Sequence, residues 1–279
     1  MSDNQTDFGF KRVNRDEKEH LVKGIFSNVA KKYDLMNDLM SAGVHRLWKN
    51  KMIQEINFDA SHNYEKQNNG ATTKVAGSQS LDNQASSNIT RFIDVAGGTG
   101  DIAFRITKKA REKNIAHTIE VVDINQEMLS CGKDRAVDLN LFSCLNFTCA
   151  NGEKLPFADN SFDFFTIAFG IRNFTNIDLG LAEAYRVLKP NGKFICLEFS
   201  KVNNYFLQKF YDSYSFNVIP RIGEIILSDR ESYQYLVESI RKFPSQEMFK
   251  KMIEQAGFKN ASYQNLSFGA AAIHVGYKD

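Results

Sequence analysis

The sequence lacks an uninterrupted apolar run of the roughly 18 residues that a membrane-spanning helix needs. Its longest apolar runs have the length of strands, so we expect a chain that does not cross a bilayer. It also lacks a strong charge bias, because 35 basic and 33 acidic residues leave a net charge of +2. That balance argues against an obligate nucleic-acid-binding protein. With 279 residues, 43% of them hydrophobic, the chain is predicted to form one compact domain with additions.

Cysteine is scarce and gives no metal-binding or disulfide pattern. Cys131, Cys144, Cys149 and Cys196 form no CxxC pair and have no histidine at metal-ligand spacing. We interpret them as reduced core thiols and expect no metal site. The N-terminal MSDNQTDFGF has no apolar segment and resembles neither a secretory signal nor a transit peptide. A reducing, cytoplasmic location is predicted.

Two amphipathic helices are predicted in the N-terminal region. Asn14 followed by Glu17 is typical of a helix start, and apolar residues then recur at helical spacing to about residue 31. After a break, a second helix is expected from Val44 to Ile56. Residues 11–51 contain ten basic and five acidic residues. This excess fits either a solvated helix face or contact with an anionic membrane surface.

Residues 59–90 differ in composition from the rest of the chain. Sixteen of these 32 residues are Asn, Gln, Ser or Thr, and few are large and apolar. Such a segment cannot bury enough surface to offset the entropy lost on ordering. We predict a disordered insertion without a chemical role.

From Arg91 onward, apolar strands alternate with amphipathic helices. This rhythm predicts an α/β, Rossmann-like fold with a mainly parallel sheet, helices on both faces and an antiparallel C-terminal finish. An aromatic-rich segment at 205–214 interrupts the alternation. Strands are expected at 91–95, 118–122, 145–149, 162–169, 193–199, 259–266 and 270–277, and helices at 102–113, 126–139, 179–188, 232–240 and 245–256.

The run FIDVAGGTGDIAFRI combines an apolar strand, a glycine turn and a helix start. Gly97, Gly98 and Gly100, with Thr99 among them, allow a ligand to approach the backbone closely. The run has neither a P-loop lysine nor GxGxxG spacing, so a nucleoside without phosphates is the predicted guest. Asp123 ends the second strand, where an acid can accept hydrogen bonds from both ribose hydroxyls. A tight turn with a helix cap is the alternative.

Two further strand ends carry candidate site residues. Asn151 and Gly152 follow the third strand, where a contact to an adenine edge and a bare turn are both compatible with the spacing. The fourth strand ends in FGIRN, which places Arg172 and Asn173 above the nucleoside. An arginine there is costly to desolvate without a partner. Either a structural salt bridge or a substrate-facing cation explains it.

Taken together, these segments resemble the class I S-adenosylmethionine-dependent methyltransferases and, more narrowly, the ubiquinone/menaquinone biosynthesis C-methyltransferase family. DVAGGTG alone indicates only a methyltransferase, whereas YDLMNDLMS, FGIRN and YSFNVIPRIG are far more specific. The resemblance covers nearly the whole chain except residues 59–90. The resembling runs are FGFKRVNRDEK, VAKKYDLMNDLMSAGVHRLWK, DVAGGTGD, DINQEML, LPFADNSFD, FGIRN, RVLKPNGKFICLEFSK, YDSYSFNVIPRIGEI and SYQYLVESIRKFPSQE.

The resemblance implies a seven-stranded sheet and methyl transfer from S-adenosylmethionine to a ring carbon of a polyprenylated quinol. The quinol is either demethylmenaquinol or 2-methoxy-6-polyprenyl-1,4-benzoquinol, and the sequence does not distinguish them. Family cofactor contacts map onto Thr99, Asp123, Asn151 and Gly152. A family serine in the fourth strand is Ala168 here, which removes a side-chain hydrogen bond.

The family chemistry requires a nucleophilic ring carbon, which is obtained most simply by ionising an adjacent phenol. A phenol with a pKa of about 10 costs roughly 4 kcal/mol to ionise at pH 7. We hypothesise that Arg172 stabilises the developing phenolate and that Asn173 orients the quinol oxygen. Tyr33, Asp34, a water or a histidine is the candidate proton acceptor, and the alternative for Tyr33 and Asp34 is that they cap and pack the helix break.

The expected organisation has three parts. Residues 1–58 form helices that cover the substrate site, 59–90 form the insertion, and 91–279 form the cofactor-binding core with a substrate lid at about 200–245. Expected partners are the quinol, a peripheral membrane contact at the cytoplasmic face, and a homo-oligomer or quinone-biosynthesis complex, without nucleic acid. A methyltransferase of soluble phenols and a non-catalytic scaffold that binds S-adenosylmethionine stay open as alternatives.

Overall fold

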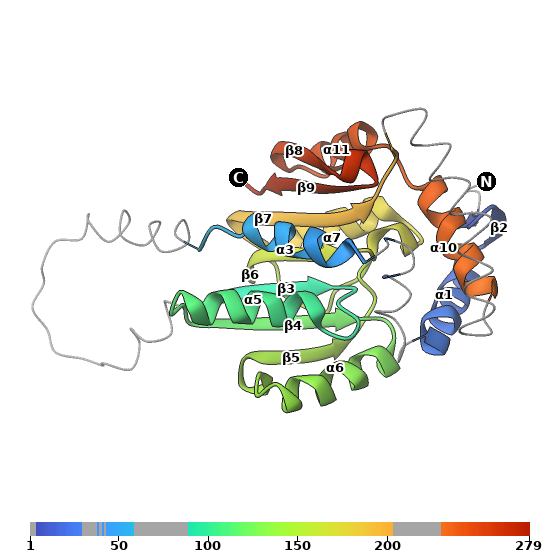
Figure 1. Cartoon of the computed structure of the whole chain (residues 1–279). Helices are drawn as coiled ribbons and strands as arrows, with labels where there is room; N and C mark the ends of the chain where they lie inside the picture. The colour runs from blue at the N-terminus through green and yellow to red at the C-terminus, as the bar shows by residue number, and fades with distance from the viewer. Residues whose placement is uncertain (1–3, 30–37, 39–40, 42, 59–88, 203–229) are drawn as a thin grey trace, which may run out of the picture.

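The computed structural model describes residues 4–29, 38, 41, 43–58, 89–202 and 230–279. The centre of the described chain is a seven-stranded sheet in the order β5-β4-β3-β6-β7-β9-β8. The strands from β5 to β7 pair in parallel, whereas β9 is antiparallel to both of its neighbours. The predicted α/β class, with a mainly parallel sheet and an antiparallel C-terminal strand, is confirmed (Figure 1).

The bounds of the elements are as follows. The strands are β1 Gln5–Phe8, β2 Lys11–Asn14, β3 Thr90–Val95, β4 His117–Asp123, β5 Leu145–Cys149, β6 Phe162–Ala168, β7 Leu188–Phe199, β8 Lys259–Leu266 and β9 Ala271–Tyr277. The α-helices are α1 Arg15–Val29, α3 His45–Gln54, α5 Asp101–Glu112, α6 Gln126–Asp138, α7 Ile177–Val187, α10 Arg230–Lys242 and α11 Gln246–Gln255. The 3-10 turns are η3 Phe142–Cys144, η4 Ile171–Asn173 and η6 Ser267–Gly269.

Alternate side chains of the central strands pack on opposite faces of the sheet. Phe92 and Val121 belong to a core that includes residues of α3 and α5, whereas Ile93 and Val122 belong to a core that includes residues of α7 and α11. Both faces of the sheet are therefore covered, as buried parallel strands require. This arrangement leaves the carboxyl ends of the strands for a site, and α1 and α10 lie beyond those ends in Figure 1.

The sequence located most of these elements. The first helix begins directly after Asn14, as expected, and β5 and β8 have the predicted bounds. The largest difference is at β7, which begins at Leu188 rather than Lys193. Leu188 pairs with Phe162 before an irregularity in the ladder, and Asn191 there has a φ of 63°. The residues of PNG carry no apolar alternation, so the local pattern predicted the strand only from Lys193 onward.

The antiparallel hairpin of β1 and β2 was not predicted from the sequence. Its strands are short and mostly polar, so they carry no apolar alternation. Gly9 forms the turn with a φ of +60°, and a Cβ built there would lie 2.3 Å from Oε2 of Glu238 in α10. The hairpin therefore packs closely on α10, which is a tertiary contact without a local sequence signal.

The expectation that all four cysteines are core thiols is wrong. Only Cys196 is buried; Cys131 and Cys144 are half-buried and Cys149 is exposed. Cys149 is the last residue of β5, which lies at the edge of the sheet. Its side chain is therefore more exposed than its place in a predicted strand suggested.

Several predictions fall on residues that the structure does not describe. These are the proton-acceptor candidates Tyr33 and Asp34, the insertion up to residue 88, and residues 203–229 of the proposed lid. Within the described residues, no helix is both long enough and apolar enough to span a membrane.

Asp94 lies inside the central strand β3 and is fully buried. Oγ1 of Thr166 in β6 donates a hydrogen bond of 2.7 Å to its Oδ1. The other oxygen, Oδ2, has no hydrogen-bond partner among the described residues. Burial raises the pKa of Asp94 to about 7, although the hydrogen bond from Thr166 opposes the shift. Ionising this carboxyl group in the folded chain is therefore costly.

We predict that Asp94 lowers the stability of the ligand-free protein as the pH rises. The unfolded chain releases this proton near pH 4 and the folded chain near pH 7, so the folded state binds more protons in between and the free energy of unfolding falls with pH. The loss between pH 5 and 8 is on the order of 3 kcal/mol for this group. The free energy of unfolding should be measured with urea at pH 5 and at pH 8. Its decrease between these pH values should be smaller in Asp94→Asn than in the unmodified protein.

The matched control is Asp134→Asn, which changes an exposed aspartate of α6. It should keep the pH dependence of the unmodified protein. If Asp94→Asn and Asp134→Asn change stability with pH in the same way, Asp94 is not the cause.

Candidate active site

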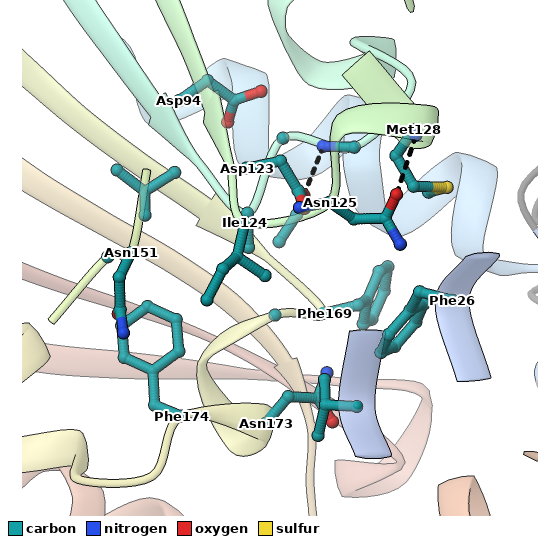
Figure 2. A pocket seen from close by; sticks show the side chains of 18 of the residues that line it. Phe26, Asp94, Asp123, Ile124, Asn125, Met128, Asn151, Phe169, Asn173 and Phe174 are labelled. Atoms are coloured by element: carbon teal, nitrogen blue, oxygen red, sulfur yellow. Dashed lines mark hydrogen bonds between the residues drawn. The ribbon is translucent and has the colours of Figure 1, made fainter. Parts of the chain in front are cut away.

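A pocket lies at the carboxyl ends of the parallel strands, where the segments after β3, β4, β5 and β6 meet. This edge is where open α/β sheets bind ligands. The pocket holds about 1060 Å³ of empty space, including the part open to solvent, which is enough for a nucleoside-sized ligand. In the view of Figure 2, Asp94 and Asp123 lie at the top of the pocket and Asn173 and Phe174 at the bottom.

The glycine turn after β3 forms one wall of this pocket. Gly97, Gly98 and Thr99 line it, and Gly98 has a φ of +54°, which favours glycine. A Cβ at Gly97 would lie 2.7 Å from Cγ1 of Val121. Gly100 does not line the pocket: it precedes α5 with a φ of +82°, and a Cβ there would lie 2.8 Å from the ring of Phe104. Gly100 therefore belongs to the turn before α5 and is not one of the residues that line the pocket.

Asp123, at the end of β4, is fixed by backbone donors. Its Oδ2 accepts a hydrogen bond of 2.9 Å from the amide of Gly98, and its Oδ1 accepts one of 2.8 Å from the amide of Asn125. Burial raises the pKa of Asp123 to about 6, while these amides oppose the shift. The group is therefore still mostly ionised at pH 7. Each oxygen keeps a lone pair for a hydroxyl donor in the pocket.

Asn151 and Gly152 line the pocket beyond Asp123. Oδ1 of Asn151 accepts a hydrogen bond of 2.8 Å from the amide of Glu153, and Nδ2 donates one of 3.2 Å to Glu19. A Cβ at Gly152 would lie 2.5 Å from the ring of Phe174. Glycine is therefore needed here for the ring of Phe174 to close this end of the pocket.

The FGIRN segment after β6 brings two predicted residues to different places. Asn173 lines the pocket together with Phe169, whereas Arg172 does not. The guanidinium of Arg172 donates at 2.6 Å to Oε1 of Glu198 and at 2.6 Å to the carbonyl of Phe169. The side chains of this ion pair are only 2% and 1% exposed. Of the two sequence interpretations of Arg172, the structure shows the structural salt bridge.

Helix α1 completes the pocket from the N-terminal segment. Val22 and Phe26 contribute apolar lining. Nδ2 of Asn125 donates to the carbonyl of Lys23 at 3.2 Å and to Oγ of Ser27 at 3.0 Å, while its Oδ1 caps α6. One side chain therefore joins the loop after β4 to both helices.

Sequence reasoning missed several lining residues. Asp94 of the lining and Glu198, which lies outside the lining, are acids inside the apolar strands FIDV and CLEF, and a buried acid is a signal that was available. The lining residues of α1, and Lys49 of α3, had no signal, because helical spacing does not reveal which distant loop a helix covers. Ala168, at the position where the resemblance implies a serine, lines the pocket. The missed lining residues with charged or polar side chains are Glu19, Lys23, Lys49, Asp94, Asp101 and Asn125.

The charge of the lining suits a cationic nucleoside. The described lining residues include five acids, which are Glu19, Asp94, Asp101, Asp123 and Glu153, and two lysines, Lys23 and Lys49. Lys49 is already paired with Asp101 at 2.8 Å. The glycine wall, the two backbone-anchored oxygens of Asp123 and the unpartnered oxygen of Asp94 thus fit a ligand with ribose hydroxyls and positive charge, which S-adenosylmethionine carries.

Comparisons with known proteins agree with this geometry. The model of the ubiE/COQ5 methyltransferase family matches residues 13–278. The chain is 53% identical to the ubiquinone/menaquinone biosynthesis C-methyltransferase UbiE of Rickettsia bellii (strain RML369-C) over 275 residues, with 99% of each chain covered. It is 52% identical to the protein of the same name from Rickettsia felis (strain ATCC VR-1525 / URRWXCal2) over 277 residues, again with 99% of each covered.

Solved structures share the fold at low sequence identity. A SAM-dependent methyltransferase from Aquifex aeolicus is 16% identical with a TM-score of 0.50, and the match covers 68% of this chain and 82% of that one. An O-methyltransferase structure from Nostoc punctiforme is 15% identical with a TM-score of 0.51, covering 68% of this chain and 52% of that one. The family match spans nearly the whole sequence and the fold is that of a methyltransferase; the chain therefore belongs to the ubiE/COQ5 methyltransferase family.

Proposed function

We propose that this methyltransferase uses S-adenosylmethionine to methylate a ring carbon of a polyprenylated quinol in respiratory quinone biosynthesis. The substrate is demethylmenaquinol, 2-methoxy-6-polyprenyl-1,4-benzoquinol or both. The observation that carries the proposal is the full-length similarity to proteins named ubiquinone/menaquinone biosynthesis C-methyltransferase. The acid-lined nucleoside pocket beside Asn173 supports it.

The cofactor would be held by the residues at the strand ends. The wall formed by Gly97, Gly98 and Thr99 would let the ligand approach the backbone, and Asp123 would accept from the ribose hydroxyls. Asn151 and Gly152 would border the adenine. When bound, S-adenosylmethionine supplies a methyl group already activated by a sulfonium.

The chain's own residues must then favour the quinolate. A hydrogen bond from the side-chain amide of Asn173 to the quinol oxygen would offset part of the roughly 4 kcal/mol needed to ionise a phenol at pH 7. The charge of Arg172 is compensated by Glu198. We therefore propose that Arg172 assists the developing phenolate mainly by holding the FGIRN segment in place, through Glu198 and the carbonyl of Phe169.

The remaining parts of the proposal rest on the sequence. Tyr33 is the proposed proton acceptor, with Asp34, a water or a histidine as alternatives. Residues 1–58 are proposed to cover the substrate site and residues 200–245 to act as its lid, above the core of residues 91–279. Assembly into a homo-oligomer or a quinone-biosynthesis complex belongs to the same proposal.

We predict that the purified protein adds one methyl group to carbon when S-adenosylmethionine and a reduced quinol are supplied. Mass spectrometry should compare reduced benzoquinol and demethylmenaquinol analogues, each with and without a prenyl tail. Asp123→Ala should weaken S-adenosylmethionine binding by calorimetry at least about tenfold, because it removes a charged hydrogen-bond acceptor. Turnover of short phenols regardless of tail would favour a soluble substrate, and cofactor binding without turnover would favour the scaffold.

Replacing Arg172 by Lys should lower turnover far more than cofactor affinity. An ammonium cannot reproduce the geometry by which the guanidinium joins Glu198 to the carbonyl of Phe169. The FGIRN segment should shift, while Asp123 and the glycine wall keep their places. Steady-state kinetics and calorimetry measure the two effects separately, and equal losses in both would contradict the role given to Arg172.

We also propose that the protein is cytoplasmic and makes a peripheral contact with the inner face of the cytoplasmic membrane. Leu47 of α3 is 66% exposed and Phe268 of η6 is 78% exposed. The two elements are joined by a hydrogen bond of 2.9 Å from Trp48 to Ser267. The exposed Arg46 lies next to Leu47 and forms an ion pair of 2.7 Å with Asp38. Exposed apolar side chains on two joined elements suit insertion into a membrane surface.

The membrane contact predicts co-sedimentation with vesicles that contain anionic lipids. Replacing Leu47 and Phe268 together by Ser should lower the bound fraction, because it removes apolar area that would enter the interface. The control replaces Leu139 and Phe142, each 54% exposed, by Ser and should bind like the unmodified protein. Absence of binding with and without quinol would remove the membrane contact from the proposal.

A further inference from the structure

The side chain of Asn173 is held from outside the pocket by a tyrosine of α10. Oη of Tyr235 donates a hydrogen bond of 3.0 Å to Oδ1 of Asn173. Tyr235 is 4% exposed and lies 62 residues further along the chain. Asn173 also lines the cofactor pocket, whereas Tyr235 lines a second pocket behind η4. The amide of Asn173 therefore stands between the two pockets.

The ring of Tyr235 is itself firmly placed. It stacks on Phe8 of the N-terminal hairpin with the ring centroids 4.4 Å apart and an interplanar angle of 24°. The charged groups near its hydroxyl are Arg172 of η4 and Glu198 of β7, which compensate each other as an ion pair. Burial raises the pKa of the Tyr235 hydroxyl well above its usual range. The hydroxyl therefore keeps its proton and serves as a donor throughout the physiological pH range.

A donor at this place decides which end of the amide faces the pocket. An asparagine amide has an acceptor end, Oδ1, and a donor end, Nδ2. With Oδ1 engaged by Tyr235, Nδ2 is left for the pocket, and no described residue accepts a hydrogen bond from it. A reversed amide could still donate from Nδ2 to the hydroxyl oxygen of Tyr235, but the buried hydroxyl proton would then lack an acceptor among the described residues, and a lone pair of Oδ1 would face the pocket. That orientation would repel a developing oxyanion.

We propose that Tyr235 is a positioning residue, which fixes the amide of Asn173 so that its N–H group points at the oxygen of the quinol and stabilises the quinolate. The inference rests on the proposed function, because it requires a phenolic substrate that contacts Asn173. It assigns to α10 and to the N-terminal hairpin a role in ring activation. The role is carried through one hydrogen bond and involves no contact of Tyr235 with the substrate.

The experiment is a double-mutant cycle with Tyr235→Phe and Asn173→Ala in the full chain. Tyr235→Phe keeps the ring and its stacking on Phe8 while it removes the donor. It should lower kcat about tenfold, leave the Kd for S-adenosylmethionine unchanged, and move the acidic limb of the kcat profile to higher pH, because the bound quinol becomes harder to ionise. In the Asn173→Ala background the same change should alter kcat less than about twofold.

The control is Tyr263→Phe, which removes a tyrosine hydroxyl from β8 at the far edge of the sheet. It should leave kcat and its pH profile unchanged. Binding of S-adenosylmethionine by each variant verifies that the chain has folded.

The cycle separates failure of the inference from failure of the proposed function. If Tyr235→Phe lowers kcat equally with and without Asn173, the hydroxyl has only a structural role. If Tyr235→Phe leaves kcat unchanged while Asn173→Ala lowers it strongly, the amide of Asn173 keeps its orientation without Tyr235. Either result overturns the role of Tyr235 alone. Full activity of Asn173→Ala on the quinol would remove Asn173 from the proposed mechanism and the role of Tyr235 with it. Absence of quinol methylation by the unmodified protein would overturn the proposed function itself.

Discussion

The buried ion pair between Arg172 and Glu198 determines the geometry on which the candidate site depends. It joins the turn after β6 to the end of β7, two neighbouring parallel strands, with both side chains almost completely removed from solvent. Further hydrogen bonds to the buried groups help to offset the cost of removing such a pair from water. Here the carboxylate of Glu198 also accepts from the amides of Phe199 and Arg172, and the guanidinium also donates to the carbonyl of Phe169, while its Nε has no hydrogen-bond partner among the described residues. The ion pair thereby fixes a short segment that carries both an aromatic wall and Asn173.

The other side of the pocket is organised by carboxylates that accept backbone amides. Asp123 binds the amides of Gly98 and Asn125, and Glu153 binds the amides of Thr175 and Asn176. Each acid joins two loops that come from different strands. Because amide hydrogen bonds to a charged acceptor are strong, the loops are held at defined separations before any ligand arrives. This preorganisation is what a methyl-transfer site needs, since the reacting atoms must be aligned.

The sheet and its helices could be predicted from the sequence, because strands 91–95 and 145–149 and the helix after Asn14 have strong local periodicity. The glycine wall and Asp123 were also predictable, since each occupies a strand end where the turn itself has a chemical signature. The partners of Arg172 and Asn173 were not. Glu198 and Tyr235 lie 26 and 62 residues further along the chain, and only the order of strands and the docking of α10 bring them together. A tertiary contact of this kind leaves no trace in local spacing.

The attachment of α1 has a thermodynamic consequence. Asn125 joins α1 to the loop after β4, Asn151 reaches Glu19, and Lys18 donates to the carbonyl of Phe174 at 2.7 Å. The loops that line the pocket are thus the same ones that hold the helix. A ligand that contacts both these loops and α1 in the shared pocket favours the docked state of α1, and docking of α1 raises ligand affinity by the same factor. Occupancy of the pocket and docking of α1 are therefore linked equilibria, so amide hydrogen exchange in α1 reports on whether the pocket is occupied.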